Sequence, residues 1–410
     1  IHFLVLSGGV LWTGPAISTV LDGESTVDVM NAMGYRAAAL GNHDFDFGLE
    51  NVIARSEQAN FPILAANLRD RETGAVPDFV QPFTVLEING IHVGLIGLTT
   101  QETPWDTQPS VVAGFEFIAY KDALREAASQ ARLQGAELLI VIGHICASEM
   151  RLLAPLAAEL GVAMIGGGHC HEEINETVNG VALVQSGSFM QAYVKVDLYF
   201  DTASDQVVRI KSNLQPNRAG KADQAIARRV DGWRARIDPR FWQPVGYAAQ
   251  EIGRKSEVMR LLITAAWLAA WPEADAALIN LRYIQQPIPA GEITPARLID
   301  VLPTRNTLVE MDITGAQLIE IIETYHPLVG GVEASPDRYH FSDGEAISPE
   351  ASYQVLIPKA LFDGGSYYEV KKYDPDASDT GVDWRQAVED YLISLESSRQ
   401  QPIERVIGDK

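Results

Sequence analysis

The residues that could most clearly do chemistry are the octapeptide GNHDFDFG at positions 41–48. It follows the apolar run 37–40, so it is expected where a buried strand ends and a loop begins. The Asn42 side chain offers a neutral oxygen to a metal ion, and His43 can act as an acid or as a cation. Asp46, three residues after His43, can orient the imidazole ring. The octapeptide therefore predicts metal and acid–base chemistry that needs further groups from other parts of the chain.

Two later stretches also directly follow an apolar run, where a buried strand is expected to end. The apolar run 138–142 ends in Gly143-His144, and Met164-Ile165 leads into the sequence GGGHCH at positions 166–171. Side chains two residues apart in an extended segment face the same way, so His169 and His171 could reach one metal ion or two adjacent ions. With Asn42, the chain offers three imidazoles and one amide from three strand ends.

The elements that must position these groups alternate between strand and helix. This order predicts α/β layering around a mostly parallel or mixed sheet, in which ligands gather at the carboxyl ends of the strands. The predicted strands are 3–6, 37–40, 63–66, 83–88, 92–98, 138–142, 163–165 and 181–186, and a closing hairpin is expected over 194–200 and 207–213. The predicted helices are 25–33, 49–58, 121–134 and 149–160.

The length of 410 residues predicts two domains. The first is expected over 1–219, a linking helix and linker over 220–250, and a second domain of α+β type over 251–410. The second domain is expected to contain helices over 256–271 and 315–324 and strands over 276–280, 307–313 and 353–358. The arginines of the linking helix are interpreted as a solvated face rather than as a binding patch.

Charge and composition argue against several classes of protein. The net charge of −22 argues against a general binder of nucleic acid or of anionic membranes, and it means that a phosphate site needs strong local positive charge. No apolar run approaches the roughly 20 residues of a membrane span, and the chain as given shows no signal-peptide pattern. The two cysteines, Cys146 and Cys170, do not form a disulfide scaffold and leave the compartment open.

The octapeptide, the Gly-His pair and the Gly-His-Cys-His stretch, in this order, resemble the calcineurin-like metallophosphoesterases. More narrowly, they resemble the 5′-nucleotidase and UDP-sugar hydrolase family. Supporting stretches are WTGPA at 12–16, VDVMNAMGY at 27–35, PAGEIT at 289–294, NTL at 306–308 and TGAQL at 314–318. The resemblance implies an N-terminal four-layer α/β/β/α domain and a C-terminal α+β substrate-recognition domain.

The resemblance also implies a function. The expected activity is hydrolysis of a phosphate ester of a nucleotide or a related small phosphorylated metabolite, with divalent ions such as Zn²⁺ or Mn²⁺, and a periplasmic or extracellular location. Carried over residue by residue, Asn42, His144 and His169 would bind one ion and His171 a second. His43 with Asp46 would stabilise the transition state of phosphoryl transfer or protonate the leaving oxygen.

In the C-terminal half, the resemblance gives Arg282 and Arg305 as candidates to bind the anionic group of the substrate. Each arginine is more simply explained as a surface or ion-paired residue. Tyr368 matches a position whose ring stacks on the base in the family, and packing in a core is an equal alternative.

The chain departs from the family pattern at the metal site. No Asp-x-His motif occurs near its start, and Val10 stands where the family has an aspartate that bridges the two metals. We therefore expect one metal ion at most. The alternatives to a phosphoester hydrolase are a weakened or inactive relative that binds its ligand without turnover, and a sulfur-ester hydrolase on the same scaffold. Cys146 and Cys170 are expected to be small buried thiols, with pairing or metal ligation as alternatives.

Overall fold

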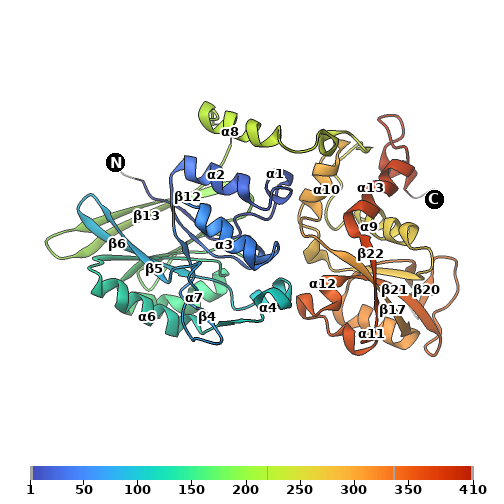
Figure 1. The fold of residues 1–410 in the computed structure, drawn as a ribbon, viewed down its shortest axis with the longest axis horizontal. Coiled ribbons are helices and arrows are strands. Elements are labelled where there is room, and N and C mark those ends of the chain that lie inside the picture. Colours follow the sequence, from blue (N-terminus) through green and yellow to red (C-terminus); the bar gives the residue numbers. More distant parts are fainter. Residues whose placement is uncertain (1–2, 219, 336–337, 408–410) are drawn as a thin grey trace. The chain divides into compact units, whose positions relative to one another are not determined.

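The computed structural model describes residues 3–218, 220–335 and 338–407 and divides the chain into two compact units. The first unit contains the residues to Thr13 and Leu21–Arg234, and the second contains Gly14–Val20 and the residues from Ala235 (Figure 1). The division at 234–235 lies within the predicted linking segment 220–250. The assignment of Gly14–Val20, with helix α1 (Ala16–Thr19), to the second unit was not predicted. The predicted domain boundaries at 219 and 250 stay predictions.

Two sheets form the centre of the first unit. The larger has the strand order β10 (Glu173–Val178), β11 (Val181–Ser186), β9 (Val162–Gly166), β8 (Leu138–Gly143), β6 (Ile91–Leu98) and β5 (Phe83–Ile88). Its four central strands run parallel, and both edge strands run antiparallel to their neighbours. The smaller sheet is parallel and contains β1 (Val5–Ser7), β2 (Tyr35–Ala39) and β3 (Ile63–Leu64). A hairpin of β12 (Ala192–Asp201) and β13 (Gln206–Pro216) and the pair β4 (Leu68–Asp70) and β7 (Phe115–Phe117) complete the strands.

Alternation of side chains along the strands produces the layers of the first unit. Leu139 and Val141 of β8 pack with helices α6 (Tyr120–Leu133) and α7 (Ala147–Glu159), whereas Ile140 packs with residues of β2, β3 and the hairpin. The other face of the smaller sheet packs with α2 (Glu24–Met33) and α3 (Leu49–Gln58), through residues such as Ala38 and Val27. The order helix, sheet, sheet, helix confirms the predicted α/β/β/α architecture.

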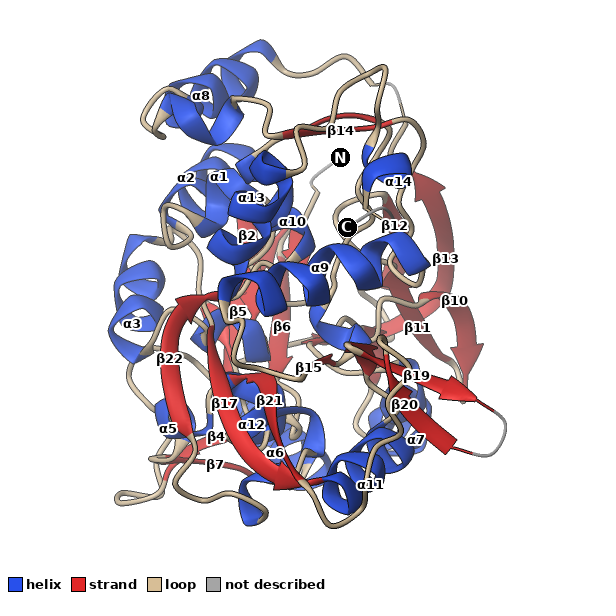
Figure 2. Ribbon diagram, turned by 90° about the vertical axis from the view of Figure 1, so that its right-hand side faces the viewer, coloured by secondary structure: helices blue, strands red, loops and turns tan. Residues whose placement is uncertain are grey.

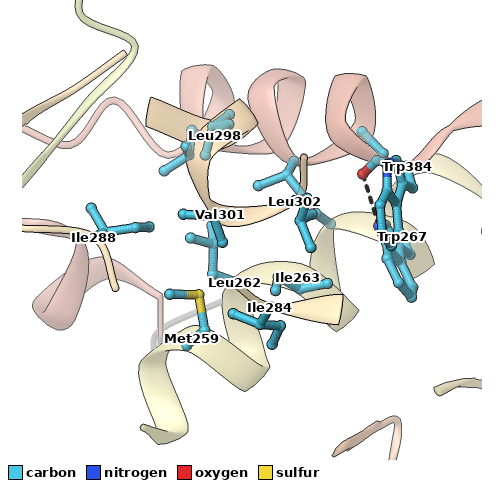
Figure 3. Packing of buried hydrophobic residues seen from close by; sticks show 14 of the residues in the cluster. Met259, Leu262, Ile263, Trp267, Ile284, Ile288, Leu298, Val301, Leu302 and Trp384 are labelled. Carbon is cyan, nitrogen blue, oxygen red and sulfur yellow. Dashed lines mark hydrogen bonds between the residues drawn. The ribbon is translucent and has the colours of Figure 1, made fainter. Parts of the chain in front are cut away.

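The second unit is built on a five-stranded sheet of order β18 (Leu328–Gly330), β15 (Ala276–Ile279), β21 (Ser352–Pro358), β17 (Thr307–Thr314) and β22 (Ser378–Asp383). One face packs with α9 (Glu257–Ala270) and α13 (Trp384–Ser394), and the other with α11 (Gly315–Tyr325) (Figure 2). Trp267 and Trp384 are fully buried, and the Trp267 indole N–H donates to the Trp384 carbonyl oxygen at 2.9 Å (Figure 3). The mixed order of elements confirms the predicted α+β class.

The remaining elements are short. In the first unit they are α4 (Thr103–Asp106), α5 (Pro109–Val112) and the 3₁₀ helix η1 (Asn42–Phe45), and in the second they are β14 (Gly246–Ala248), β16 (Gly291–Ile293), β19 (Val332–Ser335), β20 (Arg338–Phe341), α10 (Pro295–Val301), α12 (Lys359–Phe362) and α14 (Ile403–Val406). Across the described ranges, no helix combines the length and apolar character needed to cross a bilayer.

Helix α8 (Gln224–Arg234) buries none of its residues, as a solvated helix would. It is nevertheless fixed to α2, because Arg229 and the Trp233 indole N–H both donate to the Asp28 carboxylate, at 2.6 and 2.7 Å. The arginines of α8 are exposed, in agreement with the predicted solvated face, and Arg229 in addition makes this specific contact.

Candidate active site

The loops after strands β1, β2, β8 and β9 meet at one edge of the first unit. Close approach of backbones makes this possible: a Cβ atom on Gly168 would lie 2.5 Å from the Gly8 carbonyl oxygen, so only glycine fits there. The His144 Nδ1 atom lies 2.8 Å from the same Gly8 oxygen. The rings of His144 and His169 are 5.0 Å apart between centroids. The structure thus brings together two of the three strand ends that the sequence singles out, those with His144 and His169, and adds the end of β1.

Asp44 anchors the loop that carries Asn42 and His43. It is fully buried, and its two carboxylate oxygens accept hydrogen bonds from the Leu11 N–H at 2.6 Å and the Gly41 N–H at 2.8 Å. The Trp12 indole N–H donates to the Asp44 carbonyl oxygen at 2.6 Å. Burial raises the pKa of the Asp44 carboxyl to about 7, against the opposing effect of these N–H donors. Sequence reasoning missed this residue, since the octapeptide does not reveal which of its aspartates points inward.

His43 and Asp46 form a hydrogen-bonded pair within one turn of chain. The His43 Nδ1 atom lies 3.0 Å from Asp46 Oδ2, and the imidazole is more exposed (33%) than the carboxylate (6%). The Thr107 hydroxyl donates to Asp46 Oδ1 at 3.1 Å, and the Thr13 hydroxyl donates to the His43 carbonyl oxygen at 2.8 Å. Burial lowers the pKa of His43, but the carboxylates of Asp46, Asp106 and Asp44 together outweigh this effect and the net pKa is raised. The pair favours a protonated, correctly oriented imidazole.

Asn42, His144 and His169 supply a donor set that fits one divalent ion. The Asn42 side chain is fully buried; its Nδ2 donates to the Asp106 carbonyl oxygen at 3.3 Å, and its Oδ1 has no hydrogen-bond partner. Burial, reinforced by the neighbouring His169, holds the pKa of His144 well below its usual range, so this imidazole is neutral. Because a neutral His144 donates from Nδ1 to Gly8, its Nε2 atom carries the lone pair that a metal needs.

Two carboxylates that sequence reasoning missed lie beside these residues. The His169 Nε2 atom is 3.5 Å from Glu102 Oε2 and 3.6 Å from Asp106 Oδ2, and the three side chains could together hold a metal ion. Both acidic residues follow strand β6, at the same end of the sheet as His144. The rule that ligands gather at the carboxyl ends of parallel strands, applied to β6 as well as to β8 and β9, would have found them.

Val10 and His171 lie beside the same loops. Val10 has a φ of 56°, and a Cβ atom on Gly41 would lie 2.5 Å from its Cγ2 atom, so the valine adjoins the octapeptide. His171 is exposed, and its ring lies 5.8 Å from that of Phe189. Val10, His169 and His171 all have positive φ values. This backbone conformation is energetically unfavourable for these residue types, and residues that adopt it are often found at functional sites.

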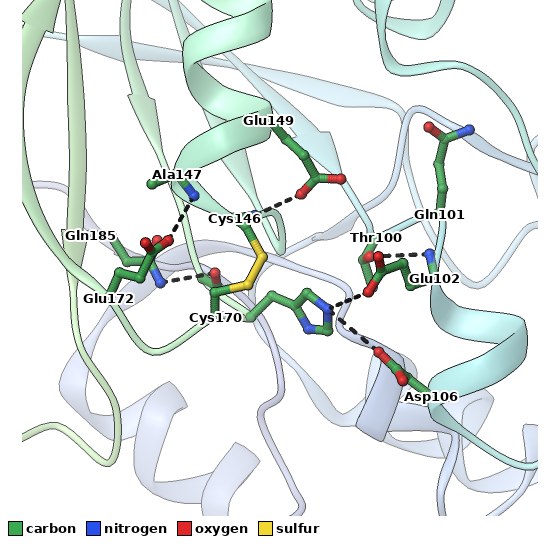
Figure 4. The surroundings of a disulfide bond; sticks show 12 residues. Thr100, Gln101, Glu102, Asp106, Cys146, Ala147, Glu149, Cys170, Glu172 and Gln185 are labelled. Carbon is green, nitrogen blue, oxygen red and sulfur yellow. Dashed lines mark hydrogen bonds and ion pairs between the residues drawn. A yellow bond between two sulfur atoms is a disulfide. The ribbon is translucent and has the colours of Figure 1, made fainter. Parts of the chain in front are cut away.

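Cys146 and Cys170 form a disulfide with a Cα–Cα distance of 5.2 Å (Figure 4). The expectation of two buried free thiols was wrong: the sulfurs are bonded, Cys170 is exposed, and neither is available as a thiolate ligand. Pairing was only an alternative in the sequence analysis, because it requires two loops far apart in the sequence to meet. The bond ties the segment after β8, with His144, to the segment after β9, with His169 and His171.

The three candidates for substrate binding lie in the second unit. Arg282 and Arg305 are exposed, and Arg282 is in the 3₁₀ helix η3 (Leu281–Tyr283). Tyr368 is only 2% exposed and stacks on Tyr325 with a centroid distance of 4.2 Å. Burial raises the pKa of Tyr368 to about 12. This arrangement matches the core-packing alternative for Tyr368.

The fold and the loops define a two-domain protein with a metallophosphoesterase-type first unit. Residues 244–373 match the family model described as 5′-nucleotidase, C-terminal domain. The chain is 24% identical to a 5′-nucleotidase of Vibrio cholerae, over 95% of this chain and 82% of that protein. It is 28% identical to a 5′-nucleotidase of Bos taurus, over 62% of this chain and 46% of that protein. The chain therefore contains a 5′-nucleotidase C-terminal domain and is similar to 5′-nucleotidases over most of its length, as its motifs indicate.

Other matches differ in name or in length. The chain is 23% identical to Endonuclease YhcR of Bacillus subtilis over 86% of this chain, but it spans only 32% of that relative. Among solved structures, a 5′-nucleotidase precursor from Thermus thermophilus matches with a TM-score of 0.83 and 23% identity, over 97% of this chain and 88% of the other. The sulfate thiohydrolase SoxB of the same organism matches with a TM-score of 0.76 and 19% identity, over 96% and 76%. These structures share the fold of the chain.

Proposed function

We propose that the chain is a metal-dependent phosphoester hydrolase that removes phosphate from nucleotides or related phosphorylated metabolites. The proposal rests on the His43–Asp46 pair, whose Nδ1–Oδ2 distance is 3.0 Å, in the same turn as the buried amide of Asn42. An acid–base group adjacent to a metal-binding group is what phosphoryl transfer requires. The naming of several relatives as 5′-nucleotidases supports the same activity.

His43 would act on the substrate through its exposed ring. Asp46 holds the Nδ1 proton, so the Nε2 atom is the one that can meet a phosphate oxygen. A raised pKa, which the carboxylates of Asp46, Asp106 and Asp44 cause against the effect of burial, favours the imidazolium form. That form can donate a proton to the leaving oxygen or stabilise negative charge on the phosphoryl group.

Asn42, His144 and His169 would hold a divalent ion, which would supply positive charge to bind and polarise the phosphate. Nitrogen and oxygen donors of this kind suit Zn²⁺ or Mn²⁺. Val10 offers no donor atom for a second ion. We therefore propose a site with one ion, with His171 as a weak additional donor. Local positive charge is needed because the net charge of −22 repels an anionic substrate at long range.

In the second unit we propose Arg282 and Arg305 as the residues that bind the anionic part of the substrate, since both guanidinium groups are exposed. Substitution of either by alanine should raise KM more than it lowers kcat. We further propose an oxidising compartment outside the cytoplasm, because the Cys146–Cys170 disulfide would persist there.

The decisive experiment measures release of inorganic phosphate from nucleoside monophosphates by the purified chain with Mn²⁺ or Zn²⁺. His43→Gln and Asp46→Asn should each lower kcat by about 10²-fold or more. The matched control is His92→Gln, which removes another His–carboxylate pair, His92 with Glu137 at 3.1 Å, at the opposite end of the parallel strands. Equal activity of His43→Gln and His92→Gln would refute the proposal.

A second candidate is a weakened or inactive relative that binds nucleotides without turnover. Val10 favours it, because loss of a bridging carboxylate removes a second ion and its charge. Nucleotide binding by calorimetry with no phosphate release would establish this reading. The substrate panel should include UDP-sugars, polynucleotides and sulfur esters, so that an endonuclease or a thiohydrolase activity would also be detected.

A further inference from the structure

The turn of helix after β6 points two carboxylates at a histidine of the candidate metal site. Glu102, the N-cap residue of α4, and Asp106, its last residue, are four positions apart, so their side chains lie on one face of the turn. Glu102 Oε2 lies 3.5 Å from His169 Nε2, and Asp106 Oδ2 lies 3.6 Å from the same atom. Figure 4 shows both carboxylates turned toward the ring beside the disulfide.

These separations are those of ligands around an ion. They exceed the roughly 2.7–3.2 Å of a normal N–H···O hydrogen bond. With metal–ligand bonds of about 2.1 Å, neighbouring ligands of a four- or five-coordinate ion lie about 3.0–3.6 Å apart. The observed 3.5 and 3.6 Å therefore match the edges of a coordination shell better than a pair of ion pairs to His169.

A second observation points to a ligand at this place. The Asn42 amide is fully buried and bonded through Nδ2 to the Asp106 carbonyl oxygen, which fixes it beside the acidic turn. Its Oδ1 atom has no partner. An unsatisfied buried oxygen costs about 1–3 kcal/mol, so a group that it can bind is expected next to it. An ion shared with His169 and the two carboxylates would satisfy it.

The acidic turn is held in position by a chain of hydrogen bonds. The Tyr120 hydroxyl accepts from the Gln101 N–H at 2.9 Å and donates to Glu149 at 2.8 Å, and Glu149 accepts from the Cys146 N–H at 2.7 Å. The turn bearing Glu102 is therefore connected to the disulfide-bonded segment that carries His144. These hydrogen bonds hold Glu102 and His144, which lie on different loops, in fixed relative positions without the ion.

We propose that Glu102 and Asp106 are metal ligands in this chain and act, with His169 and Asn42, at the divalent-ion site beside His144. This inference rests on the metal-binding part of the proposed function. In this inference, the α4 turn provides carboxylate ligands, whereas the Val10 side chain has no donor atom.

The test is isothermal titration calorimetry of the full chain, stripped of metal, with Mn²⁺ and in the absence of substrate. The variant Glu102→Gln/Asp106→Asn is compared with Glu72→Gln/Asp78→Asn, which removes the same two charges from exposed positions of the same unit. Loss of even an outer-sphere partner of a metal ligand lowers affinity about 10- to 100-fold, so the double variant should bind Mn²⁺ at least 100-fold more weakly. Circular dichroism confirms that each variant is folded, and the visible spectrum of bound Co²⁺ gives a second readout that changes when a ligand is lost.

Equal Mn²⁺ affinity in the two double variants would overturn the inference, as would failure of the parent chain to bind the ion. An altered Co²⁺ spectrum for each single variant supports it. If the carboxylates prove to be ligands but no phosphate is released from any ester, the proposed activity fails while the metal site stands. If Glu102→Gln/Asp106→Asn releases phosphate and keeps full Mn²⁺ affinity, the proposed activity stands and the assignment of these two carboxylates as ligands fails.

Discussion

Replacement of Asp44 by asparagine should change both the stability of the first unit and its dependence on pH. Asp44 accepts one backbone N–H on each carboxylate oxygen, from Leu11 and Gly41. Asparagine has only one oxygen, so its NH₂ group would face one of these N–H donors. A buried donor without a partner costs about 1–3 kcal/mol, which is the expected loss at pH 5.

The pH dependence follows from the raised pKa of Asp44. The carboxyl has a pKa of about 7 in the folded chain, against an ordinary value of 3.8. The folded state therefore binds the proton more tightly, and the contribution of Asp44 to stability is greatest below pH 4 and falls as pH rises toward 7. At about 1.4 kcal/mol per pKa unit, the group contributes a loss of roughly 3 kcal/mol between pH 5 and pH 8. Asp44→Asn has no such titration.

Urea unfolding of the two metal-free proteins at pH 5 and pH 8 measures the effect. Because a chain of two units need not unfold in one step, the transition is followed by hydrogen exchange of peptides spanning residues 37–48. The difference between wild type and variant should shrink or reverse at pH 8, where the wild type has lost its advantage. If both proteins show the same change between the two pH values, Asp44 is not buried as described and the reasoning fails.

Three further predictions concern the same loops. His43→Gln should lower kcat by about 10²-fold while Mn²⁺ affinity, measured by calorimetry, stays within about two-fold, since His43 adjoins the metal ligands without being one. Cys146→Ser should weaken Mn²⁺ binding and lower the midpoint of thermal unfolding, because a loop closed over 24 residues loses its cross-link, worth about 3 kcal/mol; an unchanged midpoint would contradict this. Val10→Asp should raise the metal content toward two ions per chain, measured by elemental analysis, whereas Val10→Ala should not. The aspartate is also the better residue at a φ of 56°, so it should not destabilise the fold.

Long periodic elements could be predicted from the sequence, and elements without a strong pattern could not. Strands β5 and β11 and helix α3 coincide with their predicted ranges, because each has a clear apolar alternation or helical spacing. Strand β10 is an edge strand with two glutamates, an asparagine and a threonine, and β22 contains Ser, Asp and Gly, so neither has the apolar signal of a buried strand.

Within the site, residue types were predictable and side-chain direction was not. The spacing of His43 and Asp46 predicted their hydrogen bond, yet the neighbouring Asp44 turns inward only because the 3₁₀ turn places it against the Leu11 and Gly41 amides. Glu102 and Asp106 stand in a polar stretch that has the composition of an ordinary loop, and only the pairing of β6 with β8 brings it to the site. The order of strands in the sheet determines which loops meet, and the local sequence of a loop does not reveal that order.

The ligands around the ion also set how much charge remains for a substrate. An ion bound by an amide and two neutral imidazoles keeps its double charge, whereas one that also binds two carboxylates is close to neutral with its ligands. The carboxylates of Glu102 and Asp106 would thus raise affinity for the ion while lowering its pull on a phosphate. In the proposed site, His43 would then supply a larger part of the positive charge at the phosphoryl group, since the carboxylates of Asp46, Asp106 and Asp44 raise its pKa against the effect of burial. If the proposed function holds, the His43–Asp46 pair therefore carries a larger share of catalysis than it would beside two metal ions.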